Sequence, residues 1–185
     1  MGTISYIKNF LSDRHVASIT PTSRFTIERI CENIDFDNTI KMIEYGPADG
    51  VVTKIMLENL SLDSKIMAIE TNENFISNLH KIKDGRLMVS HNSAEDVGAI
   101  AEKKNWNSVD YIISGIPFSF IDDPVKHKIL KESAKLLKQE GCFVAYQTSS
   151  HLIPYLKEYF EHVVMEKVFL NIPPMFIYVA NNQVR

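Results

Sequence analysis

The sequence has little of the features that would assign a chain to a class at once. It holds only two cysteines in 185 residues, Cys31 and Cys142, far apart and without metal-ligand spacing, so we expect reduced core thiols and no metal. No apolar run reaches the roughly 20 residues of a membrane-spanning helix, because Asn171 and a proline pair interrupt even VFLNIPPMFIYVA. The amino terminus lacks the basic-then-apolar layout of a secretory signal. These absences predict a cytoplasmic protein.

A surplus of basic residues is missing as well. The 20 Lys and Arg residues against 23 Asp and Glu residues give a formal net charge of -3, and the basic residues are evenly scattered. This pattern disfavours tight binding to a nucleic acid backbone. The apolar content of 45% and the charged content of 23% are ordinary for a globular protein, and the length suits one α/β domain.

Strand-like and helix-like segments alternate along most of the chain, which predicts a parallel sheet covered on both faces. The last two strands are joined only by NIPP, too short for a crossover, so we expect an antiparallel hairpin at one edge. We predict an amino-terminal helical cap over residues 1–35 and a core over 36–185. The expected strands are Ile40–Tyr45, Lys65–Ile69, Arg86–Val89, Val109–Ile113, Cys142–Tyr146, Val163–Leu170 and Met175–Ala180. The expected helices are Thr3–Ser12, Ser23–Asn33, Val51–Leu60, Asn74–Ile82, Ala94–Lys103 and Pro124–Lys138.

A glycine-containing turn follows the first expected strand, in the stretch MIEYGPADGVVTKIMLE over residues 42–58. A phosphate-binding P-loop would need a lysine after Gly50, and a dinucleotide fingerprint would need a third glycine or alanine where Val51 stands. The pattern that remains is Glu-x-Gly-x-Gly-x-Gly of S-adenosylmethionine (SAM) enzymes. Its candidate cofactor-binding residues are Glu44, Gly46, Pro47, Ala48 and Gly50, with Ala48 in place of the middle glycine.

Two further strand ends carry candidate cofactor contacts. Glu70 and Thr71 follow the second strand, and Glu70 comes 24 residues after Gly46, where an acid can accept hydrogen bonds from both ribose hydroxyls. After the third strand, Ser93 takes the place where SAM enzymes often carry an acid for the adenine amino group, and Ala94 can offer its amide to the ring. The register of Glu70 with the glycine turn favours a joint ligand site.

The turn after the fourth strand is a candidate acceptor site. A proline-fixed turn offers rigid carbonyl oxygens that can hold an amine in line with the methyl group of SAM. Phe118, with Phe120 and Tyr146, could surround a methylated ammonium as an aromatic wall. The alternative is a plain loop that packs Phe118 inward. The candidate catalytic residues are Ser114, Gly115, Ile116, Pro117 and Phe118.

Five βα units closed by an antiparallel hairpin resemble the Rossmann-like α/β fold of class I methyltransferases. SITPTSRF, IEYGPADGVVT, ISGIPF and FLNIPPMFIYVA, in this order, resemble the soluble bacterial phospholipid N-methyltransferases, which are allied to ribosomal RNA adenine dimethyltransferases. The resemblance implies that the segment Thr20–Arg24, which holds Thr22 and Ser23, closes over SAM. It also implies methylation of phosphatidylethanolamine, with S-adenosylhomocysteine as the product. The chain departs from the family at Ala48, at Ser93 and in FVAYQTSS.

Other functions remain open from the residues alone. They are an adenine N6-methyltransferase acting on RNA, which Ser114 in place of Asn or Asp disfavours, another small-amine methyltransferase, and a non-catalytic SAM-binding module. The segment Thr3–Ser12 reads as an amphipathic helix that either lies on an anionic membrane surface, with Lys8 and Arg14 near the lipid, or covers the protein's own fold. In the first case the protein would be peripheral at the inner membrane surface.

Overall fold

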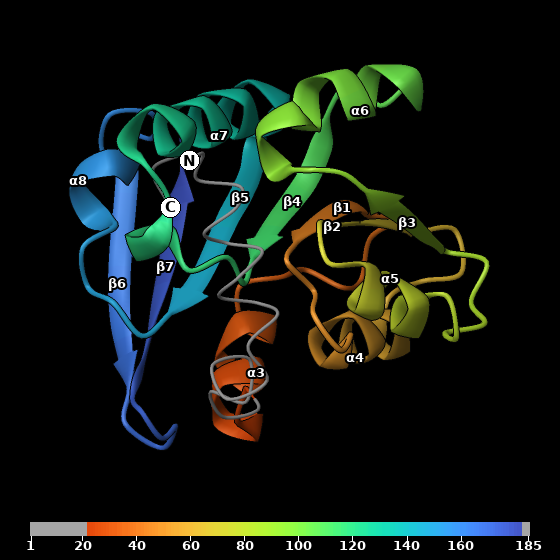
Figure 1. Ribbon diagram of the computed structural model, residues 1–185, viewed down its shortest axis with the longest axis horizontal. Helices are drawn as coiled ribbons and strands as arrows, with labels where there is room; N and C mark the ends of the chain where they lie inside the picture. Colours follow the sequence, from red (N-terminus) through yellow and green to blue (C-terminus); the bar gives the residue numbers. More distant parts are fainter. Residues whose placement is uncertain (1–21, 183–185) are drawn as a thin grey trace.

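The structure is a computed structural model that describes residues 22–182 and has a seven-stranded sheet at its centre (Figure 1). The strand order is β3-β2-β1-β4-β5-β7-β6, with β1 to β5 parallel and β7 antiparallel to both of its neighbours. The predicted Rossmann-like sheet with its antiparallel hairpin is therefore confirmed. The strands are β1 (Lys41–Tyr45), β2 (Lys65–Glu70), β3 (Leu87–His91), β4 (Val109–Ser114), β5 (Leu137–Gln147), β6 (His162–Val168) and β7 (Met175–Asn181).

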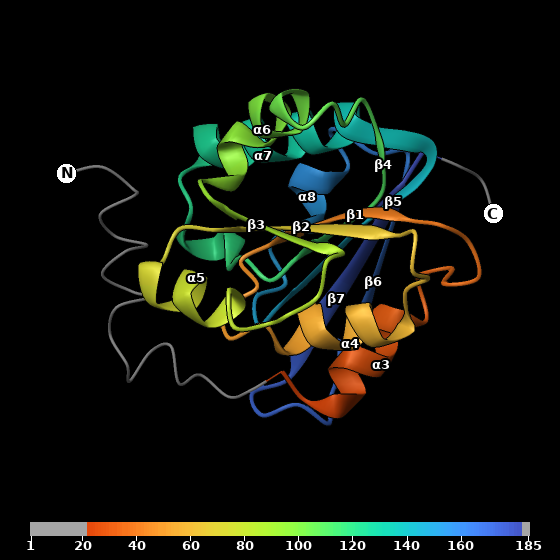
Figure 2. The same cartoon turned by 90° about the vertical axis from the view of Figure 1, so that its right-hand side faces the viewer.

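Helices cover both faces of this sheet (Figure 2). Helices α6, α7 and α8 lie on one face, and α3, α4 and α5 lie on the other. The α-helices are α3 (Arg24–Cys31), α4 (Val51–Asn59), α5 (Glu73–Leu79), α6 (Val97–Lys103), α7 (Asp123–Leu136) and α8 (Ile153–Leu156). Two short 3₁₀ helices, η1 (Ala94–Asp96) and η2 (Phe118–Phe120), follow β3 and β4.

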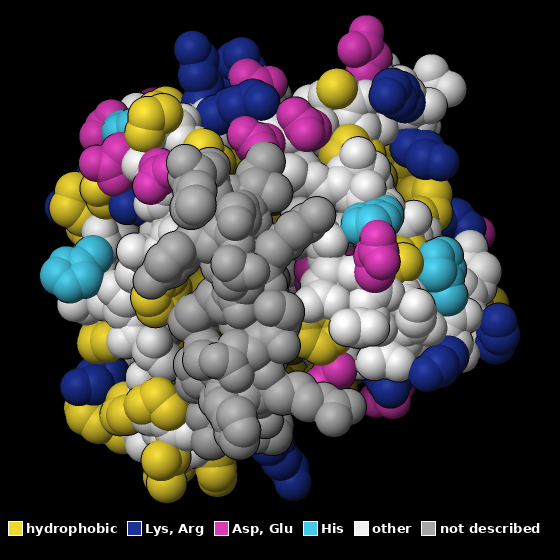
Figure 3. Space-filling view, viewed as in Figure 1, with side chains coloured by type: hydrophobic (Ala, Val, Ile, Leu, Met, Phe, Trp, Pro, Cys, Tyr) yellow, Lys and Arg dark blue, Asp and Glu magenta, His cyan; other side chains and the backbone are white. Residues whose placement is uncertain are grey.

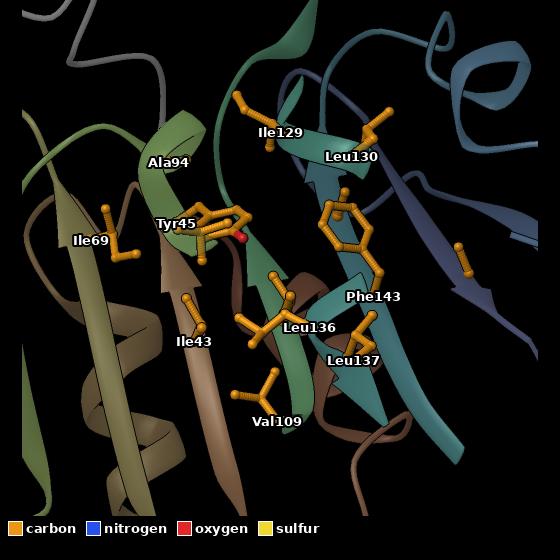
Figure 4. Packing of buried hydrophobic residues seen from close by; sticks show 14 of the residues in the cluster. Ile43, Tyr45, Ile69, Ala94, Val109, Ile129, Leu130, Leu136, Leu137 and Phe143 are labelled. Carbon is orange, nitrogen blue, oxygen red and sulfur yellow. The ribbon is translucent and has the colours of Figure 1, made fainter. Parts of the chain in front are cut away.

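The central strand β1 is buried on both faces, which explains its nearly continuous apolar sequence. Ile43 and Tyr45 pack in the cluster beneath α6 and α7, part of which Figure 4 shows, and Met42 packs in the cluster beneath α3 and α4. Tyr45 is buried with its hydroxyl 3.0 Å from that of Ser133, so its polar atom is satisfied within the core. Glu44 is the one acid in this strand, and its environment is part of the candidate site.

Some element boundaries differ from the sequence expectations. The predicted helix through Lys138 ends at Leu136, and β5 begins at once at Leu137, which pairs with Val109 before the ladder shifts register and Cys142 pairs with Tyr111. The polar run at the start of β5 has no alternation that would mark it as a strand. Helix α8 was not predicted, because four residues give too little periodicity.

The predictions for the carboxyl-terminal hairpin and for the amino-terminal helix have different outcomes. Strand β6 ends at Val168 rather than at the predicted Leu170, and the NIPP segment lies in the hairpin loop as expected. The predicted helix Thr3–Ser12 lies outside the described residues. Across residues 22–182, every helix is too short or too polar to cross a membrane.

Candidate active site

Three strand ends meet at the carboxyl edge of the sheet, where the strand order reverses around β1. The Gly46 amide donates to the Ile69 carbonyl oxygen over 3.0 Å, which ties the turn after β1 to β2. The Gly115 amide donates to the Tyr45 carbonyl oxygen over 2.9 Å, which ties β4 to the same turn. Ligands of doubly wound sheets bind at such a switch point, so the geometry places the candidate cofactor and acceptor turns at one site.

The turn after β1 requires backbone conformations that favour glycine. Gly46 and Gly50 have φ angles of +63° and +74°, and a Cβ atom at Gly50 would lie 3.0 Å from a methyl group of Leu79. Ala48 has φ +49°, a left-handed conformation that costs an alanine about 1 to 2 kcal/mol. Glycine would adopt this conformation without that cost. The Gly50 amide donates to the carbonyl oxygen of the buried Pro47 over 2.9 Å.

Glu70 ends β2 with its side chain 4% exposed. Its Oε1 accepts hydrogen bonds from the backbone amides of Thr71 (2.7 Å) and Asn72 (2.9 Å), and its Oε2 accepts a longer one from the amide of Ala48 (3.3 Å). Burial raises the pKa of Glu70, and these amide hydrogen bonds oppose the rise. Oε2 therefore has capacity left for a ligand hydroxyl, since a carboxylate oxygen can accept more than one hydrogen bond.

A cavity of about 140 Å³ lies between the turns and has mostly apolar walls. Such a cavity suits a flat base attached to a sugar, because the apolar walls can cover the base while the Glu70 carboxylate accepts from the hydroxyls. The residues present thus fit the nucleoside part of SAM. The lining comprises Gly46, Ala48, Ile69, Glu70, Thr71, Phe75, Asn92, Ser93, Ala94, Gly115, Ile116, Pro117, Ile121, Val125 and Ile129.

Ser93 and Ala94 begin the 3₁₀ helix η1 at one wall of this cavity. The Ser93 hydroxyl accepts a hydrogen bond of 3.4 Å from the Glu95 amide, so it caps η1. Ala94 is buried and packs in the core cluster beneath α6 and α7. The structure therefore brings both sequence-predicted residues to the cavity.

A buried polar cluster lies beneath the glycine turn, on the α3 and α4 face. Oε2 of Glu44 accepts a hydrogen bond of 2.6 Å from the Thr53 hydroxyl, while Oε1 has no partner among residues 22–182. Burial raises the pKa of Glu44 to about 7, the Thr53 hydroxyl opposes the rise, and the negative charge of Glu70 adds to it. A protonated Glu44 is therefore populated near neutral pH.

Tyr146 of β5 connects this cluster to the start of α3 and to the acceptor turn. Its hydroxyl shares a hydrogen bond with the side chain of Thr22, and burial, with a further contribution from Glu44, raises its pKa above the ordinary value. A Cβ atom at Gly115 would lie 2.6 Å from the Tyr146 hydroxyl oxygen, so only glycine lets the phenol approach the turn. Ser23, next to Thr22, is the N-cap of α3 and its hydroxyl accepts from the Thr26 amide.

The acceptor turn after β4 is fixed by its own backbone and by β5. Ser114 is buried, and its hydroxyl accepts a weak hydrogen bond of 3.4 Å from the Ile116 amide. The Phe118 amide donates to Oε1 of Gln147 over 3.0 Å, and Nε2 of Gln147 donates to the Ser149 carbonyl oxygen over 2.9 Å. Sequence reasoning missed Gln147, because a glutamine at the end of a strand gives no signal of its own.

The aromatic residues of this turn divide between core and surface. The Phe118 side chain is only 1% exposed and packs in the cluster beneath α7 and α8. Phe120 is exposed, and Tyr146 reaches the turn through its hydroxyl. The inward-packing alternative therefore describes Phe118, because η2 turns its side chain toward the core. Within residues 22–182, no group of three or more His, Cys, Asp or Glu side chains could hold a metal ion.

Comparisons with known proteins agree with this fold. No family model matches the chain. It is 20% identical over 174 residues, which cover 92% of this chain and 91% of the relative, to an ornithine lipid N-methyltransferase of Singulisphaera acidiphila. Its fold is similar to that of a precorrin-6y C5,15-methyltransferase of Geobacter metallireducens, with a TM-score of 0.69, 16% identity and coverage of 90% and 92%.

A SAM-dependent methyltransferase of Aquifex aeolicus is similar as well, with a TM-score of 0.64, 14% identity and coverage of 96% of this chain and 97% of that one. These likenesses show the Rossmann-like fold of class I methyltransferases, and the glycine turn and the acid at the end of β2 lie at the edge of the sheet where this fold binds its ligands.

Proposed function

We propose that the chain transfers a methyl group from SAM to the amine of a lipid headgroup, with phosphatidylethanolamine as the acceptor. The single observation that carries the proposal is the contact between the two turns. A Cβ atom at Gly115 would lie 3.1 Å from the Gly46 carbonyl oxygen, and both residues line the same cavity. Donor and acceptor would therefore meet in one cavity, as a direct transfer requires.

The cofactor side of the proposed site uses the residues around the glycine turn. Oε2 of Glu70 would accept from the ribose, and Ser93 and Ala94 would flank the adenine at the cavity wall. Thr22 and Ser23 lie near the turn through Tyr146, which suits the closing role that the family resemblance gives them. Bound SAM supplies an electrophilic methyl carbon attached to a positively charged sulfur.

The acceptor side uses the turn from Ser114 to Pro117. The amine nitrogen would form a bond to the methyl carbon as the carbon–sulfur bond breaks, and the nitrogen must have lost its ammonium proton beforehand. Carbonyl oxygens of the turn would accept hydrogen bonds from the remaining N–H groups and hold the lone pair in line. The hydrogen bond that the Phe118 amide donates to Oε1 of Gln147 keeps the end of this turn in place.

The lipid acceptor is supported by the relative that acts on ornithine lipid, because the match spans nearly all of both chains. The net charge of -3 disfavours RNA as the acceptor. A lipid substrate also implies peripheral contact with a membrane, and the predicted amphipathic helix Thr3–Ser12 stays a prediction for that contact.

The test supplies methyl-labelled SAM to the purified chain with four acceptors in separate tubes. These are phosphatidylethanolamine vesicles, ornithine lipid vesicles, RNA and small soluble amines. We expect label in phosphatidylethanolamine. Label in RNA alone, or in soluble amines alone, would replace the proposal by the corresponding alternative. SAM binding without transfer to any acceptor would favour a non-catalytic module.

A further inference from the structure

The loop that joins β6 to β7 presents large apolar side chains to solvent. Phe169, Leu170 and Ile172 are 71%, 65% and 79% exposed. Figure 3 shows hydrophobic side chains gathered over the tip of this hairpin, at the lower left of the view. Large apolar side chains that are clustered on a surface commonly mark an interaction site.

This loop lies at the same edge of the sheet as the candidate active site. Strand β7 is antiparallel to both β5 and β6, so β6 runs in the same direction as β5 and ends at the carboxyl edge. The strand pairing shows how far along the sheet the loop begins, because Phe176 of β7 pairs with both Gln147 and Lys167. Gln147 holds the acceptor turn, so the base of the loop is level with the acceptor side of the site.

The loop is held firmly, although its apolar side chains are exposed. Asn171 lies between Leu170 and Ile172 and is itself buried. Its Oδ1 accepts from the Ser23 amide over 2.8 Å and from the Thr26 hydroxyl over 3.2 Å. Its Nδ2 donates to the Pro173 carbonyl oxygen over 2.8 Å. The buried asparagine thus fixes its two neighbours in an outward orientation.

A path of direct contacts connects the loop with the acceptor turn. Asn171 contacts Ser23, the adjacent Thr22 shares a hydrogen bond with Tyr146, and the Tyr146 hydroxyl lies against Gly115. A surface that the loop touches would therefore lie on the acceptor side of the carboxyl edge of the sheet.

The loop also carries a positive charge at its base. The Lys167 ammonium lies 4.8 Å from the ring centroid of Phe169 and 5.4 Å from that of Phe176. Within residues 22–182, Lys167 has no acidic partner at ion-pair distance, whereas the neighbouring Glu166 is paired with Arg29. An apolar tip above an unneutralised lysine suits a bilayer surface with anionic lipid, because the tip can enter the acyl region while the ammonium stays at the headgroups.

We propose that Phe169, Leu170 and Ile172 insert into the lipid interface and hold the active-site edge against an anionic membrane. This inference rests on the proposed function, since a lipid acceptor must be reached from the bilayer surface. The protruding shape of the tip favours a soft surface over a second copy of the chain, which would need a matching hollow.

The test measures sedimentation of the full chain with vesicles of phosphatidylethanolamine and phosphatidylglycerol, in the absence of SAM. We expect Phe169→Ser combined with Ile172→Ser to weaken vesicle binding by at least about tenfold. The matched control is Leu62→Ser, because Leu62 is 86% exposed but precedes β2 at the opposite edge of the sheet. The control should bind vesicles as the wild type does.

A second measurement follows the loop directly. The single tryptophan, Trp106, is buried, so vesicles should leave the wild-type emission unchanged. Ile172→Trp should give a blue-shifted emission on vesicle addition and quenching by brominated lipid. Unchanged vesicle binding in the double variant, no vesicle binding by the wild type, or an Ile172→Trp emission that ignores lipid would each overturn the proposal. Loss of a dimer in the double variant would instead assign the patch to a second copy.

The failure of this inference can be distinguished from the failure of the proposed function. Transfer to phosphatidylethanolamine dispersed in detergent micelles tests the acceptor without requiring attachment to a bilayer. If the wild type methylates the micellar lipid, the proposed function stands whatever the vesicle result. If it binds vesicles through the loop but never methylates the lipid, the proposed function fails and the loop is still a membrane-binding surface.

Discussion

Glu70→Gln is the substitution that best isolates the cofactor contact. Glutamine is nearly isosteric, and its one carbonyl oxygen can keep the hydrogen bonds that Oε1 accepts from the Thr71 and Asn72 amides at 2.7 and 2.9 Å. The amide nitrogen would then stand at the position of Oε2, where it cannot accept from Ala48 or from a ribose hydroxyl. The variant therefore keeps the local fold and loses the charged acceptor that faces the cavity.

The magnitude follows from the charge-assisted hydrogen bond that is lost. Such a bond contributes about 1.5 to 3 kcal/mol, so the dissociation constant for SAM should rise by roughly 10- to 150-fold. Glu70→Ala should cost more, because two backbone amides would lose their acceptor and the free energy of unfolding would fall as well.

Isothermal titration calorimetry with SAM and S-adenosylhomocysteine measures the affinity, and thermal melts show whether each variant is folded. The matched control is Glu73→Gln, which removes the same charge from an exposed position at the start of α5. It should leave the affinity unchanged. A folded Glu70→Gln variant with wild-type affinity, or an equal loss in Glu73→Gln, would refute the assignment of Glu70 to the ribose.

Four further predictions concern the site and its support. Ala48→Gly should raise the free energy of unfolding by up to about 1 kcal/mol in denaturant titrations and leave SAM affinity intact, because φ +49° strains alanine; a loss of stability would contradict that reading. Glu44 has a folded pKa of about 7, above its unfolded value near 4.5, so its stabilising contribution is full below pH 4.5 and is lost as pH rises through 7. Between pH 5 and 8 the free energy of unfolding of the wild type should therefore fall by about 2 to 3 kcal/mol more than that of Glu44→Gln in denaturant titrations, and an equal pH dependence in the two would rule this out. Gln147→Ala should lower turnover far more than SAM affinity, since Gln147 holds the acceptor turn; equal losses in the two would assign it to the cofactor side. Phe118→Ala should lower the free energy of unfolding by about 3 to 5 kcal/mol, as for a core phenylalanine, whereas a small change in stability with a large loss of turnover would restore its proposed contact with the acceptor.

The sequence predicted the sheet because its signals were local and repeated. Each of the first four strands was a short apolar run followed by a helical segment, and the NIPP connection was too short for anything but a hairpin. The convergence of Gly46, Glu70 and Gly115 followed from the same logic, because carboxyl ends of parallel strands share one edge. The positions of these residues directly after successive strands were therefore enough to locate the candidate site.

The features that were not predicted depend on packing between distant segments. Which way the Phe118 side chain points is decided by η2 and by the space beneath α7 and α8. The bonds of Gln147 to the acceptor turn and of Asn171 to the start of α3 join residues 29 and 148 positions apart in sequence. Asn171 lies in the quoted stretch FLNIPPMFIYVA, but the partners of both side chains are distant in sequence, so only the folded chain reveals what they hold.

The most direct test of the account identifies the methylated product. Wild type and Glu70→Gln are incubated with methyl-labelled SAM and phosphatidylethanolamine vesicles, the lipid is extracted, and its headgroup is released and analysed by mass spectrometry. We predict label on the ethanolamine nitrogen with the wild type, and much less with Glu70→Gln at SAM concentrations below its raised dissociation constant. Lipid that stays unlabelled while the wild type binds SAM, or label on any atom other than that nitrogen, would contradict the account.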